Sequence, residues 1–241
     1  MRFVSFFFFL SFTLSGSIKS KDVLKLFEET ALTWLPGSTT LAKRDQKLAK
    51  KRTNDLKVSL KGDWSSESKS AVSKAMNEIN ELINVRICFS DEAESKFLFL
   101  YKDPDLFTAK IDDRALFIPS SINWSWYIYY SEDKPYSISE GYGYINSDKT
   151  IDEKFVYSAT LRILAGSLGF TNRTDNWKFR DSFFYNFCDF ETNNFGDTGL
   201  TDLDRAVVKL LYQKEIKPGL GIREIKRMCS THNLLKRVGG R

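Results

Sequence analysis

The residue types that could carry out catalysis are scarce in this chain. Its 241 residues include one histidine, His232, and three cysteines, Cys88, Cys188 and Cys229. Composition alone therefore excludes any mechanism that needs two histidines. Cys229 and His232 could together offer two metal ligands, but a structural zinc site needs more. A Cys–His nucleophilic pair would also need a carboxylate to orient the imidazole, and the sequence around His232 is basic.

Carboxylates are plentiful, so a hydrolase that uses two of them stays an alternative, although no spacing singles out a pair. The segment 189–197, DFETNNFGD, alternates oxygen-bearing side chains as calcium loops do. It lacks the central glycine of such a loop, and its closing position holds Leu200 in place of glutamate. We therefore expect a polar loop here, and neither a metal nor a cofactor. The sequence has no P-loop, G-x-S-x-G or G-x-G-x-x-G motif.

The N-terminus has the pattern of an export signal. Arg2 precedes an apolar run over 3–14, and the small residues Ser15, Gly16 and Ser17 predict cleavage after residue 17. The run is too short to span a bilayer, and no later apolar run is long enough. We expect a secreted or periplasmic protein whose mature chain has no transmembrane segment.

The charge pattern separates an N-terminal part from the rest. A helical segment and the basic run LAKRDQKLAKKR, 41–52, precede the first strand pattern, so we predict a helical arm and basic linker over 18–52 and a domain over 53–241. The basic run suits either an anionic partner or a solvated linker. The formal net charge is only +5, and no base-stacking motif is present, so we expect no nucleic-acid partner.

Apolar periodicity predicts the elements that must position any site. Alternating apolar and polar residues indicate strands at 56–61 and 85–89. A continuous apolar run, typical of a strand in the middle of a sheet, lies at 96–102. Another strand is indicated at 141–145, at the end of a long aromatic stretch. Ser65 or Ser66 begins an intervening helix. Residues 152–168 are apolar almost all round, which predicts a buried helix, and Thr201 opens a last helix over 203–211. This order predicts an α/β (α+β) fold with a mixed sheet and a C-terminal helical part.

This element order, with a buried helix ending in Ser167-Leu168-Gly169-Phe170, resembles the zincin metallopeptidase fold, most closely its metzincin-type members. The resemblance covers about 55–220. Segments LGF, SFFYN and LLYQKEIKPGLG are also similar to a secreted family of unknown function that looks like degenerate zincins. The resemblance implies a zincin-like mixed sheet whose "active-site" helix is the buried one.

The metal-binding motif of metzincins, H-E-x-x-H-x-x-G-x-x-H, is degenerate here. The resemblance places Arg162, Gly166 and Asn172 at the ligand positions and Ile163 at the position of the general base; only Gly169 matches. Glycine has no ligand atom, arginine repels a dication and isoleucine cannot accept a proton. We therefore expect no catalytic residues and no zinc, which weighs against an enzyme.

Arg162 is the only charged residue between Phe155 and Leu168, and a buried guanidinium needs acceptors. One hypothesis is that it replaces the charge of the metal and holds an anionic group in the old cleft. The other is a structural ion pair with Asp202, Asp204 or Glu140.

The stretch 123–144 is rich in tryptophan and tyrosine, whose rings can grip peptides or stack on sugars. It supplies a candidate ligand surface, beside an edge strand with which a peptide could pair. Its members are Trp124, Trp126, Tyr127, Tyr129, Tyr142 and Tyr144. The alternative is that these rings only cover the sheet edge.

Three functions follow. The first is a secreted, non-catalytic pseudo-peptidase that binds a peptide, protein or glycan outside the cytoplasm. The others are a carboxylate-based hydrolase of a wall or matrix polymer and a structural partner in envelope assembly. Export also favours at most one disulfide, and we expect Cys188–Cys229 among the three pairings.

Overall fold

The computed structural model describes residues 18–33, 48–90, 98–103, 124–130, 136–145, 153–185 and 199–239. Several predicted features lie outside these residues. They are the signal peptide over 1–17, the basic residues 41–47, Cys188 and the polar loop 189–197.

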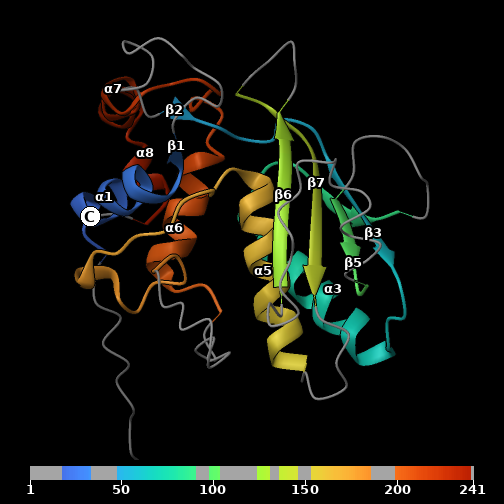
Figure 1. The fold of residues 1–241 in the computed structure, drawn as a ribbon. Helices are drawn as coiled ribbons and strands as arrows, with labels where there is room; N and C mark the ends of the chain where they lie inside the picture. The colour runs from blue at the N-terminus through green and yellow to red at the C-terminus, as the bar shows by residue number, and fades with distance from the viewer. Residues whose placement is uncertain are drawn as a thin grey trace, which may run out of the picture.

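A five-stranded mixed sheet forms one half of the fold (Figure 1). Its order is β4-β3-β5-β7-β6, in which neighbouring strands are parallel except for β6 and β7. The bounds are β3 (Leu56–Lys61), β4 (Ile87–Phe89), β5 (Leu98–Tyr101), β6 (Trp124–Tyr130) and β7 (Ile138–Ile145). The predicted α/β class is thus confirmed, and β5 lies mid-sheet, as its continuous apolar sequence predicted.

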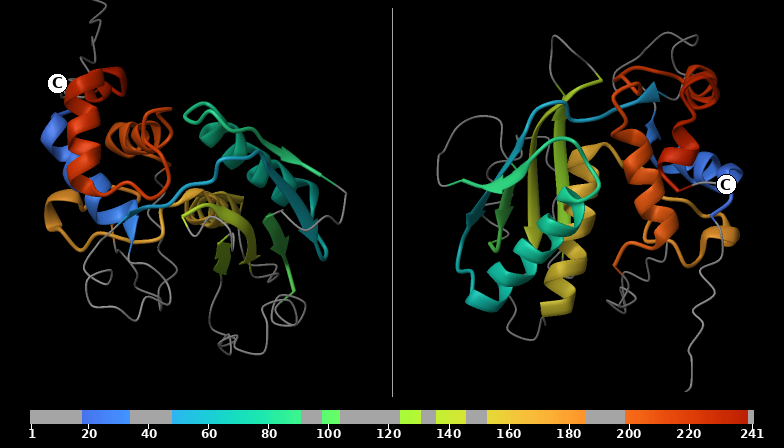
Figure 2. Two further views of the ribbon diagram at one scale, coloured as in Figure 1. Left: turned by 90° about the horizontal axis from the view of Figure 1, so that it is seen from above. Right: turned by 180° about the vertical axis from the view of Figure 1, so that it is seen from behind.

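Two helices, α3 (Ser66–Asn80) and α5 (Glu153–Leu168), pack against each other on one face of the sheet (Figure 2). Ser65 caps α3 by accepting a hydrogen bond from the Ser68 N–H at 3.1 Å. Most of α5 is buried, as its sequence predicted. Gly143 of β7 permits the close packing, because a Cβ there would lie 2.6 Å from Cγ2 of Ile163.

Helices from both ends of the chain form the other half (Figure 1). Helix α1 (Ser20–Thr30) packs against α6 (Asp202–Leu211), with further contacts to α8 (Leu234–Arg237). Helix α7 (Ile222–His232) and α8 extend the fold beyond the helix that the sequence analysis took as the last. That prediction was wrong because α7 buries only Ile225 and Cys229, so its largely polar and charged sequence resembles a solvated tail. The short strands β1 (Leu32–Thr33) and β2 (Leu48–Ala49) pair beside these helices.

The end of the basic run is buried, contrary to the hypothesis of a solvated linker. Lys50, Lys51 and Arg52 are 1%, 6% and 2% exposed. Lys51 Nζ donates to the carbonyl oxygen of Leu211, the last residue of α6, at 3.1 Å and to that of Ile216, beyond the helix, at 2.9 Å. Burial, with a smaller contribution from Lys217, lowers the pKa of Lys51 to about 8.

Arg52 connects the same segment to the sheet half. Its guanidinium donates to the carbonyl of Ser139 in β7 at 3.1 Å and, at 3.5 Å, to that of Ser167 at the end of α5. Burial lowers the pKa of Arg52 to about 10. Residues 50–52 therefore join the two halves of the fold, while the division at residue 53 stays a prediction.

Cys229 is a free thiol in the structure, and its predicted disulfide partner, Cys188, lies outside the described residues. Cys229 lies on α7 one turn after Ile225 and faces the core, and burial raises its pKa to about 11. Cys88, on the edge strand β4, is also free. In the described part of the chain, the helices are all too short or too polar to cross a bilayer.

Candidate functional site

The degenerate motif occupies the second half of α5 and the turn that follows. Ile163 is fully buried against β7, and Gly166 is also buried. Arg162 lies half-buried on α5, with its Cζ atom 4.5 Å from the ring centroid of Phe183. At the positions where the resemblance implies metal ligands and a base, the helix therefore presents one cation, one apolar side chain and one glycine.

Gly169 ends α5 with φ +124°, in the left-handed region that favours glycine. The N–H of Phe170 donates to the carbonyl of Ala165 at 2.9 Å, which satisfies the end of the helix. A Cβ at residue 169 would lie 2.1 Å from the carbonyl oxygen of Lys50. The turn thus requires glycine twice, for its backbone angle and for its contact with the buried basic segment.

Asn172, the last degenerate position, is used structurally. Its Nδ2 donates to the carbonyl of Leu32 at 2.8 Å, and its N–H donates to the carbonyl of Thr30 at 3.3 Å. These bonds hold the end of α1 and strand β1 against the segment after α5. None of the three positions at which the resemblance implies zinc ligands therefore resembles a metal site. Arg162 lies over a ring, Gly166 has no side chain, and the Asn172 amide is bonded to backbone.

A small cavity of about 30 Å³ lies beside Arg162. It joins the start of β6 to α5 and to the segment after it. Its walls combine two guanidinium groups, three phenylalanine rings and an indole. The lining residues are Trp124, Arg162, Ala165, Phe170, Thr171, Asn172, Arg173, Phe183 and Phe184.

Packed rings hold these walls in place. Phe184 stacks on Phe170 at 4.9 Å between centroids and meets Phe183 edge to face at 5.6 Å. Arg173 lies over the indole of Trp124, with Cζ 5.2 Å from the ring centroid. Both guanidinium groups therefore lie over aromatic rings.

The loop that carries these phenylalanines is anchored by Asp204. Its carboxylate accepts hydrogen bonds from the Ser182 hydroxyl, the Phe183 N–H at 2.9 Å and the Thr201 N–H at 2.9 Å. Thr201 in turn caps α6 in a capping box. Asp204 is fully buried, and burial raises the pKa of its carboxyl. The Thr-x-x-Asp spacing was the sequence signal for this anchor, but Asp204 was considered only as a partner of Arg162.

The predicted aromatic surface is only partly exposed. Trp124 and Tyr144 are 8% and 4% exposed, which corrects their assignment to a ligand surface. Helix α5 packs on the face of the sheet that Gly143 and Trp124 share, so the Trp124 ring packs inward, whereas Tyr144 follows Gly143 in β7 and lies on the opposite face. Tyr142 is half-buried and donates its hydroxyl hydrogen bond to Glu140. The side chains of the other three predicted members, Trp126, Tyr127 and Tyr129, lie outside the described residues, although their backbones pair with β7.

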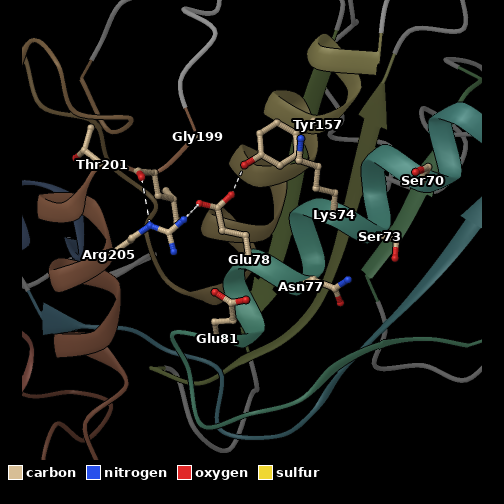
Figure 3. Close-up of a pocket in the computed structure, with 11 residues that line it drawn as sticks. Ser70, Ser73, Lys74, Asn77, Glu78, Glu81, Tyr157, Gly199, Thr201 and Arg205 are labelled. Carbon is tan, nitrogen blue, oxygen red and sulfur yellow. Dashed lines mark hydrogen bonds and ion pairs between the residues drawn. The ribbon is translucent and has the colours of Figure 1, made fainter. Parts of the chain in front are cut away.

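A larger, open pocket of about 920 Å³ lies between α3, the start of α5 and the start of α6 (Figure 3). At its centre Glu78 accepts hydrogen bonds from the Tyr157 hydroxyl and from Arg205, and Lys74 lies over the Tyr157 ring at 4.9 Å. Burial and the Glu78 carboxylate raise the pKa of Tyr157. Sequence analysis missed this cluster because its members come from three separate helices.

The described residues contain no group of three or more His, Cys, Asp or Glu side chains placed to hold a metal ion. A scan against protein-family models gives no match to this chain, and a search of curated proteins gives none either. The similarity to zincins therefore stays a prediction from the residues.

Proposed function

We propose that this chain is a secreted, non-catalytic pseudo-peptidase that binds an extended peptide segment along strand β6. The observation that carries the proposal is the position of β6 at the edge of the sheet. Its seven residues, WSWYIYY, pair with β7 on one side, and no other described strand pairs with the opposite side. Such an edge offers a row of backbone donors and acceptors to a further strand.

The sequence of β6 also lacks the usual protection of an edge strand. Natural edges are blunted by charged side chains, proline or short length. This strand has no charged residue and no proline over its whole length. The β-bulge between Tyr129 and Tyr130 interrupts the pairing only at its far end. An uncharged, regular edge of this length is expected where pairing with another chain is part of the function.

The state of α5 favours binding over peptide hydrolysis. The positions corresponding to zinc ligands are used for stacking on Phe183, for helix packing and for holding backbone through Asn172. Two of the six predicted aromatic residues, Trp124 and Tyr144, are buried and so offer no face to a sugar. A peptide therefore fits the site better than a glycan.

The decisive test removes backbone donors from β6 by proline substitution. Tyr127→Pro and Ile128→Pro are made separately, and binding to an array of short extended peptides is measured with each thermal midpoint. Because successive N–H groups of a strand point to opposite sides, one variant breaks the ladder to β7 and the other removes a donor from the free edge. We expect the variant that keeps its thermal stability to lose peptide binding.

The opposite edge provides the matched control. Ser90 N–H donates to the carbonyl of Val58, so the N–H of the preceding residue, Phe89, points away from the sheet. Phe89→Pro should leave both stability and peptide binding unchanged. The proposal is refuted if the wild-type protein binds no peptide. It is also refuted if both β6 variants keep their thermal stability and bind peptides as the wild type does.

One observation favours a second candidate, the carboxylate-based hydrolase. The pocket of about 920 Å³ holds two carboxylates, that of Glu78 in α3 and that of Glu81 directly after this helix, together with Tyr157. Release of reducing ends from peptidoglycan, chitin or hyaluronan would support it, provided that Glu81→Gln abolishes the release without lowering stability. The third function, envelope assembly through the basic run, loses support at residues 50–52, since these side chains are buried.

A further inference from the structure

The C-terminal end of the described chain concentrates positive charge. Segment 213–239 contains seven lysines and arginines and two glutamates, hence a formal charge of +5, which equals that of the whole chain. Its helix α7 lies at the outer edge of the helical half, away from the sheet and from strand β6 (Figure 1, Figure 2). We infer that the outward face of α7 binds an acidic polysaccharide. This inference goes beyond the proposed function, because it concerns a second ligand and does not depend on pairing at β6.

The outward face of α7 is a row of polar and cationic side chains that runs along the helix. Its members, all exposed, are Arg223, Lys226, Arg227 and Ser230. Residues three and four apart lie on the same side of a helix, so these positions share one face. The buried residues of α7, Ile225 and Cys229, lie on the other side and anchor the helix in the core. The fold therefore holds three cations in a fixed arrangement on its surface.

The two glutamates of this segment are already used within the fold. Glu224 accepts a hydrogen bond from the Gly221 N–H at 2.9 Å and so completes the first turn of α7. Glu215 forms an ion pair with Arg237, in which Nη1 and Oε1 are 2.8 Å apart. Neither carboxylate is therefore paired with a cation of the outward face of α7.

Two of the three cations on this face are available to a ligand. Lys226 Nζ lies 3.8 Å from the carboxylate of Glu28 in α1, at the outer limit of an ion pair. Among the residues that the structure describes, Arg223 and Arg227 pair with no carboxylate. Guanidinium keeps its charge at any accessible pH, and its planar array of donors matches the paired oxygens of an acidic group. The face therefore offers two bidentate sites for anions, one helical turn apart.

The chemistry of α7 favours a polysaccharide over a membrane or a nucleic acid. Helices that bind membrane surfaces insert apolar side chains into the lipid. The exposed residues of α7 are all polar or charged, and its apolar side faces the core. Its sequence, IREIKRMCSTH, has no Phe, Tyr or Trp to stack on a base. A row of cations suits a linear polymer with an acidic group on each repeat, and the expected export would bring the protein to such polymers.

The first test compares three polymers that share one backbone. Dextran is neutral, whereas carboxymethyl dextran and dextran sulfate carry acidic groups on the same chain. Their binding to the wild-type protein is measured by isothermal titration calorimetry. We expect the acidic polymers to bind and dextran not to bind. Raising NaCl from about 0.05 M to about 0.5 M should weaken binding at least about tenfold, because salt screens exposed charges.

Two double variants then locate the binding. Arg223→Gln combined with Arg227→Gln should weaken binding of dextran sulfate at least about tenfold, because two charge-assisted contacts are lost. The matched control combines Lys69→Gln with Arg86→Gln, which removes the same charge from exposed positions in the sheet half. It should weaken binding by less than about twofold, since exposed charges far from the ligand are screened. All four side chains are exposed, so both double variants should keep the thermal midpoint of the wild type.

The outcomes separate a specific face from general attraction. The inference is overturned if neither acidic polymer binds, or if the two double variants weaken binding equally, because net charge alone would then explain it. Tighter binding through α7 to vesicles of equal parts phosphatidylcholine and phosphatidylserine, or to a short DNA duplex, would overturn a polysaccharide as the partner. Peptide binding at β6 should be unchanged in the α7 double variant, so either proposal can fail without the other.

Discussion

Gly169→Ala should destabilise the protein strongly, because two separate costs meet at this residue. The backbone there has φ +124°, a conformation that alanine adopts at a cost of about 1–3 kcal/mol. The new Cβ would also lie 2.1 Å from the carbonyl oxygen of Lys50. That carbonyl cannot retreat freely, since the neighbouring residue Ala49 is bonded on both sides to the 219–220 turn, at 2.7 Å and 2.9 Å.

Overpacking of a rigid contact adds about 1–3 kcal/mol to the conformational strain. The combined loss is about 4 kcal/mol in the free energy of unfolding, or a fall of about 10 °C in the thermal midpoint for a chain of this size. Urea unfolding followed by circular dichroism measures the first quantity, and calorimetry measures the second.

Gly239→Ala separates the two costs. Gly239 has φ +93°, but nothing lies within 4 Å of a Cβ built there. Its alanine variant therefore measures conformational strain alone, and it should lose no more than about 1–3 kcal/mol. The reasoning is refuted if the Gly169 and Gly239 variants lose the same stability, since the contact with Lys50 would then contribute nothing.

Three further predictions concern buried polar groups. Asp204→Asn should lower the free energy of unfolding by about 3 kcal/mol in urea titrations, because the Asp204 carboxylate accepts hydrogen bonds from four donors. Asp202→Asn, on the exposed first turn of the same helix, is the control and should change this free energy by less than about 0.5 kcal/mol. The pKa of Lys51 is lowered to about 8 from 10.5, so the unfolded chain binds more protons between these values. Wild-type stability should therefore rise with pH from about 8 to 10.5 relative to Lys51→Met, by at most about 1.4 kcal/mol per pH unit, and parallel curves would contradict the assignment. Iodoacetamide at pH 8 should alkylate the half-buried Cys88 and spare Cys229, because burial raises the pKa of the Cys229 thiol to about 11. Mass spectrometry of the folded and the urea-unfolded protein measures the labelling of each cysteine. Equal labelling of Cys88 and Cys229 in the folded protein would contradict this prediction.

Local patterns were sufficient for most of the elements. The alternation of Leu56, Val58 and Leu60 predicted β3, and the apolar sequence of 152–168 predicted the buried α5. Thr201 predicted the start of α6, since a capping residue acts within one turn. Patterns failed at α7, because a helix that buries two side chains leaves hardly any apolar periodicity.

The candidate site was less predictable because its parts come together only in the folded chain. The position of Arg162 on α5 followed from the sequence, but its neighbours Phe183 and Arg173 belong to a segment whose course no local pattern specifies. The same holds for Trp124, because the sequence of an aromatic strand is the same whether the Trp124 ring faces solvent or the core. Its burial depends on what packs against that face.

Composition by itself excluded two-histidine metal chemistry, since a single His232 cannot supply two ligands in any fold. Periodicity by itself determined the mixed α/β class, because backbone hydrogen bonding and side-chain period are local properties. Only the tertiary structure decided that Lys51 and Arg52 are buried. Charged side chains are ordinarily solvated, and these two are accommodated by carbonyl oxygens of residues far away in sequence, at the ends of α5 and α6.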